Sequence, residues 1–329
     1  MNDSCLTILD WLLTDGGSEQ QTPIESIRDW KSCYDKNAER WQEPVDRAIS
    51  GGYKADRTAH AFLAGFFSAL QRLLPGLPKD HITAFCISEE GGAHPRAIKT
   101  RLERMDSLDP NGNAWRLNGR KQFITCANDA DSILVAASTG TDTEGRNCIR
   151  LAHIDRNSAG VKIEPMPDLP FIPEIRHGVV FLENVAVADS QLLEGDAYPA
   201  YIKPFRTIED IHVSAAILGY LLRCAVLFQW PLTTRESLLG LIAAIRPLAK
   251  ADPLAPSIHI AYAGLQRSMG LIVSDLDQYW KNAPDADKKA WERDRAVMGI
   301  ARKASTIRLE SAWKTCAASQ PVTPGSTPG

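Results

Sequence analysis

The sequence lacks the usual signatures of a nucleotide-binding loop and of a metal site. It contains neither a Gly-x-Gly-x-x-Gly run after a predicted strand nor a phosphate-binding Gly-Lys-Ser/Thr loop. Its seven cysteines are scattered and include no Cys-x-x-Cys pair, so we expect no structural zinc site and no disulfide framework. The cysteine pattern predicts reduced thiols in a cytoplasmic protein without a bound metal.

Charge imbalance and long apolar runs are also missing. The 37 Lys and Arg residues nearly balance 40 Asp and Glu residues, for a net charge of −3, so electrostatics predicts neither nucleic acid nor an anionic membrane as a partner. No uninterrupted apolar run reaches the ~18 residues of a membrane-spanning helix. The first residues carry no basic signal-peptide region. With 329 residues, 44% of them hydrophobic, the chain is long enough for two or three domains.

Helical periodicity dominates both ends of the chain. Residues 1–83 predict a short N-terminal helical domain, whose segment 59–74 is apolar on most of its circumference and should be a buried helix. Residues 197–319 predict a C-terminal helical bundle, and residues 320–329, rich in Pro, Ser, Thr and Gly, predict a disordered tail. The expected bundle segments are 207–228, 236–248 with an interruption at Pro247, 257–280 and 286–315.

The middle of the chain, residues 84–196, carries strand signals. Apolar runs occupy 84–87, 133–137 and 179–187, and Asn118-Gly119 is the strongest two-residue hairpin signal in the sequence. No helical pattern separates the predicted strands. The pattern therefore favours an antiparallel β-barrel or sandwich over a parallel sheet.

Two short runs in this middle part resemble a known family. They read Ser88-Glu-Glu-Gly-Gly-Ala-His-Pro95 and Leu117-Asn-Gly-Arg-Lys-Gln-Phe-Ile-Thr125. In order and spacing they are similar to the acyl-CoA dehydrogenase family, whose middle domain carries Thr-Glu-Pro-Gly-Ala-Gly-Ser-Asp and then Leu-Asn-Gly-x-Lys-x-(Trp/Phe)-Ile-Thr. The resemblance covers about 84–225. It implies shortened N-terminal helices, a central antiparallel β domain and a shortened C-terminal bundle.

The resemblance also implies an activity and a cofactor. It implies FAD-dependent α,β-dehydrogenation of an acyl thioester, on CoA or a carrier protein, by a homodimer or homotetramer. By correspondence Thr125 would face flavin N5, Phe123 would pack on the ring, and Ser88 with the neighbouring Glu89 would reach the pyrimidine edge. The alternative is that Thr125 and Phe123 are ordinary strand residues that favour β structure.

One acidic residue corresponds to a catalytic position of the family. Glu209 lies where the branched-chain and long-chain types carry the glutamate that removes the α-proton, although Asp210 replaces the arginine that normally follows. Two adjacent acids at a helix start would also complement the helix macrodipole. His94 and Arg206 are candidate substrate-binding residues, and the alternative for His94 is a loop histidine with a structural contact.

Departures from the family pattern keep other functions open. Glu90, Ala93, His94 and Pro95 replace the usual Pro, Gly, Ser and Asp, and no Arg-x-x-Phe-Gly or Gly-Gly-x-Gly element is present for the flavin diphosphate. A divergent non-catalytic homologue, acting as a binding protein or partner subunit, is one alternative, and a flavin-dependent monooxygenase is another. The pair Arg120-Lys121 is a candidate phosphate contact, with Arg120 expected to face solvent.

Overall fold

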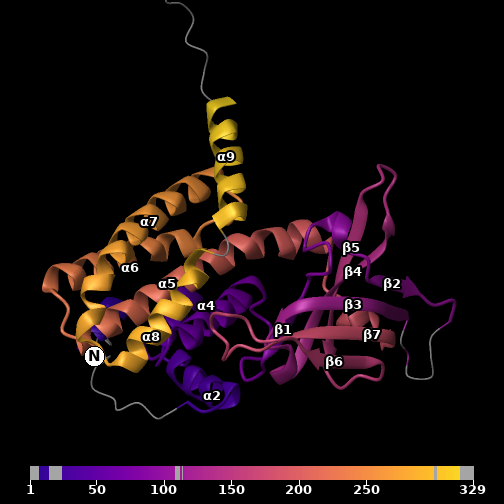
Figure 1. Ribbon diagram of the computed structural model, residues 1–329. Helices are drawn as coiled ribbons and strands as arrows, with labels where there is room; N and C mark the ends of the chain where they lie inside the picture. Colours follow the sequence, from indigo (N-terminus) through magenta and orange to yellow (C-terminus); the bar gives the residue numbers. More distant parts are fainter. Residues whose placement is uncertain (1–6, 15–23, 108–111, 113, 300–301, 319–329) are drawn as a thin grey trace, which may run out of the picture.

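The computed structural model describes residues 7–14, 24–107, 112, 114–299 and 302–318. Within these residues helices gather on one side of the molecule and a curled sheet lies on the other (Figure 1). This arrangement confirms the predicted fold of N-terminal helices, a central β part and C-terminal helices. The predicted disordered tail, 320–329, lies outside the described residues.

The N-terminal helices pack around aromatic side chains. Trp11 contacts Trp41 and Tyr53 edge to face, and Trp30 stacks on Tyr34. Residues 59–70 of the last of these helices are almost all buried, as its apolar circumference predicts. The helices are α1 (Ile8–Leu13), α2 (Ile27–Ala38), α3 (Pro44–Tyr53) and α4 (Thr58–Leu73).

The sheet is mixed, which the sequence pattern did not predict. Among the described residues seven strands pair in the order β1-β4-β2-β3-β7-β6, with β5 added to β4. Four pairings are antiparallel, but β4 pairs in parallel with both β1 and β2. Parallel neighbours are often joined by a crossover helix, but here β2 and β3 lie between β1 and β4 in the chain and return it to the edge where β4 starts. The strands are β1 (Thr83–Cys86), β2 (Arg101–Arg104), β3 (Trp115–Thr125), β4 (Ser132–Thr141), β5 (Asn147–Asp155), β6 (Val161–Pro165) and β7 (His177–Val187).

The hairpin predicted at Asn118-Gly119 is wrong. Both residues lie inside β3, where the pairing register with β7 shifts between Leu117 and Gly119. The shift is a β-bulge. Glycine is required because a Cβ there would lie 2.4 Å from the Thr100 hydroxyl, and φ is 156°. The Asn118 side chain accepts a hydrogen bond from the Asn184 N–H, so it joins β3 to β7 instead of turning the chain.

Two predicted helix boundaries in the C-terminal part are also wrong. Pro247 does not interrupt its helix, because Ile245 and Ala249 are buried on either side of it and Arg246 makes two hydrogen bonds to Asp46. The expected helix 286–315 is divided, since the described chain leaves the α-helix at Asp294 and continues as a 3₁₀ segment. The elements are α5 (Lys203–Leu227), α6 (Leu232–Lys250), α7 (Pro256–Asp275), α8 (Asp285–Asp294), η7 (Arg295–Gly299) and α9 (Arg302–Ala318).

Three glycines allow α5 to lie unusually close to α3 and α4. An added Cβ at Gly52 would lie 1.9 Å from the Ala216 carbonyl oxygen, and one at Gly219 would lie 2.2 Å from that of Ile49. A Cβ at Gly65 would lie 2.4 Å from the Cα of Val213. Backbone therefore meets backbone at all three contacts. This packing fixes the position of α5, which starts beside the sheet and runs into the helical half (Figure 1).

Among the described helices, the stretch Tyr198–Leu227 is long and apolar enough to cross a membrane, judged by its length and composition alone. Of its most apolar window, 67% is buried inside the protein. Its apolar character is therefore explained by its place in the core, between α3, α4 and α6. All cysteines that the structure describes are free thiols.

Candidate functional site

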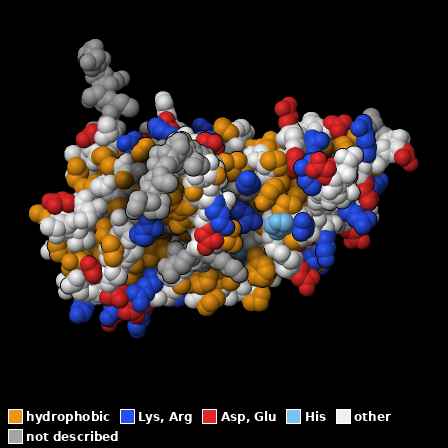
Figure 2. Space-filling model, turned by 90° about the horizontal axis from the view of Figure 1, so that it is seen from above, with side chains coloured by type: hydrophobic (Ala, Val, Ile, Leu, Met, Phe, Trp, Pro, Cys, Tyr) orange, Lys and Arg blue, Asp and Glu red, His pale blue; other side chains and the backbone are white. Residues whose placement is uncertain are grey.

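A cavity of about 1140 Å³ lies between the sheet and the helices. Its walls come from β3, β7 and the turn after β1 on one side, and from α4, α5, α7 and α9 on the other. Figure 2 shows hydrophobic side chains exposed between the two halves, with Lys and Arg beside them. Five residues singled out in the sequence line this cavity: Ser88, Phe123, Thr125, Arg206 and Glu209.

The end of β3 presents an aromatic ring and a hydroxyl to the cavity. Phe123 is 54% exposed and has a left-handed backbone (φ 58°), where the register with β7 shifts a second time. Its N–H contacts the Met166 sulfur at 3.3 Å. This exposure and backbone conformation are unusual for a large aromatic residue in a strand. They show that Phe123 is not an ordinary buried strand residue.

Thr125 lies opposite His177, a cavity residue that the sequence reasoning missed. The two residues are register partners in β3 and β7, and the Thr125 hydroxyl is 3.5 Å from His177 Nε2. His177 Nδ1 lies 3.1 Å from the Ile175 carbonyl, which can only accept, so Nδ1 carries a hydrogen and Nε2 faces the hydroxyl. Burial lowers the His177 pKa. Its place after a proline-rich loop was the only signal available in the sequence.

Glu89 and Lys121 form a buried ion pair behind the cavity wall. Lys121 Nζ lies 2.8 Å from Glu89 Oε1 and also donates to the Ile87 carbonyl. The Glu89 carboxylate accepts further hydrogen bonds from the backbone N–H groups of Lys99 and Thr100. Glu89 is not among the cavity-lining residues. The pair spans Ser88, so its visible role is to hold the turn that carries that residue.

This pair also corrects the interpretation of Lys121 as a phosphate contact. Its side chain is fully buried, whereas the neighbouring Arg120 is exposed, as expected. Successive side chains of a strand point to opposite faces, so Lys121 points into the protein where Arg120 points to solvent. The burial of Lys121 is tolerated because the Glu89 carboxylate neutralises its charge.

Two adjacent acids of α5 face the cavity from the helical side. The pKa of Glu209 is raised to about 8, because burial disfavours its charged form and the Asp210 carboxylate adds repulsion. Burial likewise raises the pKa of Asp210 to about 6, although Arg308 of α9 forms an ion pair with it. No such pair is seen for Glu209 among the described residues. Glu209 is therefore the carboxyl of the two that is available for proton transfer.

The remaining two candidates occupy different surroundings. Arg206, one turn before Glu209 on α5, donates a 3.3 Å hydrogen bond to the Ala93 carbonyl and so joins the helix to the turn after β1. His94 is exposed and lies outside the cavity lining; its Nδ1 accepts from the Arg96 N–H at 3.3 Å and caps a short 3₁₀ turn. The structure therefore brings Arg206, but not His94, to the cavity.

Comparisons with known proteins give one consistent family. The model of the acyl-CoA dehydrogenase middle domain matches residues 84–185. The probable acyl-CoA dehydrogenase YngJ of Bacillus subtilis (strain 168) is 27% identical over 132 residues, 40% of this chain and 32% of that protein. The mitochondrial short/branched chain specific acyl-CoA dehydrogenase of Rattus norvegicus is 29% identical over 154 residues, 46% of this chain and 34% of that protein. The chain thus aligns with about a third of the length of these curated relatives.

A solved structure supports the fold over nearly the whole chain. Butyryl-CoA dehydrogenase from Megasphaera elsdenii superposes with a TM-score of 0.70 at 16% identity, covering 95% of this chain and 99% of that one. At this identity the likeness speaks for the fold alone. It extends the similarity from the matched β part to the helices on both sides of it.

Proposed function

We propose that this chain, whose residues 84–185 match the acyl-CoA dehydrogenase middle domain, is an FAD-dependent oxidoreductase that acts on acyl thioesters in the cavity between sheet and helices. One observation carries the proposal. Glu209 has a raised pKa and forms no ion pair with the side chains that the structure describes, and it shares one cavity with the exposed Phe123 ring and the Thr125 hydroxyl. A carboxyl with a pKa near the working pH, in a cleft, is suited to proton transfer.

The residues of the sheet side fit the ring system of a flavin. About half of the Phe123 side chain is exposed, so its aromatic ring is available to pack against a planar ligand. Thr125 and Ser88 offer hydroxyls on the same wall. The Thr125 hydroxyl also lies 3.5 Å from His177 Nε2. Bound there, FAD would supply the hydride acceptor. These are the residues that would hold its ring.

Glu209 would take the proton from the carbon next to the thioester carbonyl. Burial disfavours its charge, so the deprotonated carboxylate is a stronger base than an exposed glutamate. Asp210, held by Arg308, keeps a second negative charge nearby and maintains that elevation. Arg206 would remain at its contact with Ala93 and limit how far α5 can separate from the sheet turn.

The first test is spectroscopic and needs no knowledge of the acyl group. The protein is purified without added cofactor, titrated with FAD, and then mixed anaerobically with a panel of saturated acyl-CoA thioesters. We expect about one flavin per chain and bleaching of its visible band by at least one thioester. A protein that ignores FAD would contradict the proposal and favour the binding-protein or partner-subunit alternative. If FAD binds but the protein consumes oxygen only after the flavin has been reduced by an added reductant, the monooxygenase alternative would be favoured.

We further propose a homo-oligomer, as the family implies. Large apolar side chains lie exposed on two helices away from the sheet: Leu271 of α7 is 70% exposed, and Ile307 and Trp313 of α9 are 59% and 56% exposed. Contiguous exposed apolar patches commonly mark contact surfaces, and α7 packs against α9. Light scattering coupled to size exclusion should give a dimer or tetramer, and Trp313→Asp should shift it toward the monomer.

A further inference from the structure

One wall of the cavity is a loop that holds a strained residue. The segment 166–176, between β6 and β7, lines the cavity with Leu169, Phe171 and Ile172. Ile172 is 2% exposed and has a left-handed backbone, with φ at 43°. A β-branched residue adopts this conformation at a cost, which persists only where the surroundings hold it in place.

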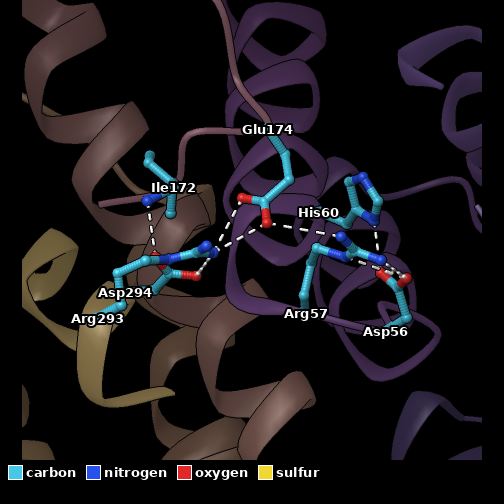
Figure 3. Close-up of polar contacts among 7 residues, drawn as sticks. All are labelled: Asp56, Arg57, His60, Ile172, Glu174, Arg293 and Asp294. Carbon is cyan, nitrogen blue, oxygen red and sulfur yellow. Dashed lines mark hydrogen bonds and ion pairs between the residues drawn. The ribbon is translucent and has the colours of Figure 1, made fainter. Parts of the chain in front are cut away.

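The residue that holds Ile172 comes from far along the chain. The Asp294 side chain is fully buried, and its carboxylate accepts a 2.7 Å hydrogen bond from the Ile172 N–H. The same carboxylate accepts from Arg293 Nε at 2.6 Å and Nη2 at 2.8 Å, so its charge is balanced (Figure 3). A buried carboxylate that is both paired and hydrogen-bonded is a strong, directional anchor.

The anchor continues through the loop to α4. Arg293 also donates to Glu174 of the loop at 2.9 and 3.2 Å, and Arg57 lies 3.5 Å from the same carboxylate (Figure 3). Arg57 in turn lies 2.8 Å from Asp56. Burial would raise the Asp56 pKa, but hydrogen bonds from His60 and Arg57 outweigh it and hold that pKa at about 2. We call Asp56, Arg57, Glu174, Arg293 and Asp294 the ionic bracket.

We propose that the ionic bracket fixes this wall of the cavity, so that Ile172 is a specificity-determining residue for the acyl group and Asp294 is its positioning residue. The proposal rests on the proposed function, because it takes an acyl thioester as the ligand. The bracket ties the loop to α8 on one side and to α4 on the other, and α4 supplies the apolar lining residues Phe62 and Phe66. A wall held from both sides cannot withdraw to admit a longer chain. The side chain at 172 therefore limits the room.

The positioning half is tested without any ligand, by amide hydrogen exchange of peptides spanning 166–176. Asp294→Ala should raise exchange at Ile172 about tenfold or more, since it removes a buried hydrogen bond to a charged acceptor. Asp294→Asn keeps an acceptor and should have a smaller effect. Asp46→Asn is the matched control: Asp46 is a buried carboxyl bound to Arg246 by two hydrogen bonds, away from the cavity lining. Unchanged exchange in both Asp294 variants would overturn the proposal.

The specificity half is tested with Ile172→Gly, which suits the left-handed backbone and removes only the side chain. Binding of butyryl- to decanoyl-CoA is measured calorimetrically on the flavin-loaded protein. We expect the preferred chain to lengthen, with about a tenfold relative gain for the longer thioesters, while Asp46→Asn leaves the preference unchanged. An unaltered preference would overturn the assignment of Ile172. If the unmodified protein binds no thioester, the proposed function fails and the specificity claim with it, whereas the exchange result still decides the bracket.

Discussion

Two glutamates in the protein interior differ in the direction of their pKa shift. Burial would raise the pKa of Glu89, but Lys121 and two backbone N–H groups outweigh it, so that pKa is lowered. Burial also raises the pKa of Glu209, and there the neighbouring Asp210 adds to the rise instead of opposing it. Enclosure alone therefore does not decide a carboxyl's role. Glu89 is committed to holding a turn, and Glu209 is left able to exchange a proton.

The strongest way to sharpen this contrast is Glu209→Gln. The substitution keeps the shape of the side chain and removes the base, so the rate of thioester-dependent flavin reduction should fall about 10²–10⁴-fold. Denaturant unfolding should show no loss of stability, because the amide is neutral at every pH, whereas the Glu209 carboxyl must take up a proton to stay uncharged when the chain folds. Glu292→Gln, an exposed change on α8, is the control. A Glu209→Gln variant that keeps the full rate would exclude Glu209 as the base.

The same isosteric change at Glu89 should act on stability instead of rate. Glu89→Gln leaves the fully buried Lys121 ammonium without its counter-charge, and we expect a loss of about 3–5 kcal/mol in the free energy of unfolding. Combining it with Lys121→Met should restore much of that loss. Glu164→Gln, which breaks the exposed Lys162–Glu164 pair, should leave unfolding unchanged. The comparison breaks down if Glu89→Gln is as stable as the unmodified protein.

The raised pKa of Glu209 gives opposite pH dependences for activity and stability. The base form appears only as pH rises through about 8, so kcat/KM should climb up to that pH and then level off. In the unfolded chain the same group ionises near its ordinary pKa of 4.5. Between about pH 4.5 and pH 8 the Glu209 carboxyl is protonated in the folded protein but ionised in the unfolded chain. Its contribution to the free energy of unfolding therefore decreases as pH rises through this range.

Stability profiles of the unmodified protein and Glu209→Gln separate this contribution from those of the other groups. The difference between the two profiles should grow from pH 4.5 toward pH 8. Parallel profiles would show that Glu209 titrates normally.

The smallest expected effect is at Asp210, whose charge helps to raise the pKa of Glu209. Asp210→Asn removes that repulsion and leaves Arg308 nearby, so the midpoint of the pH–rate profile should move down by about one unit. The plateau rate should change little. A shift to higher pH would mean that loss of the Arg308 ion pair has rearranged α9, and that the charge is not acting directly.

The residues of the candidate site differ in how far the sequence could reveal them. Ser88, Phe123, Thr125, Arg206 and Glu209 were found because they lie in runs whose order and spacing resemble those of a family, and the structure brings all five to one cavity. Their roles remain predictions. His177 and Asp294 were not predicted, and Arg308 was expected on a solvated helix face, because each acts through a partner more than 50 residues away. Single-sequence patterns report only local spacing.

The errors in the fold have the same origin. Asn118-Gly119 is a hairpin signal by local propensity, but Thr100 and Asn184 turn it into a bulge within β3. Lys121 looks like a surface charge until Glu89 is placed beside it. Pro247 looks like a break until Asp46 and the buried faces of α6 hold the helix through it. In each case a tertiary contact overrode a local preference.

By itself the sequence determined the helix–strand–helix order, the apolar faces that bury α4 and α5, and the motifs that resemble those of the acyl-CoA dehydrogenase middle domain. These follow from periodicity and spacing along one stretch of chain, which any folded form must satisfy. Only the tertiary structure decided which strands pair in parallel, which buried charge has a partner, and which loop forms the cavity wall. Those outcomes depend on contacts between distant residues, whose desolvation and pairing set the electrostatics of the cavity.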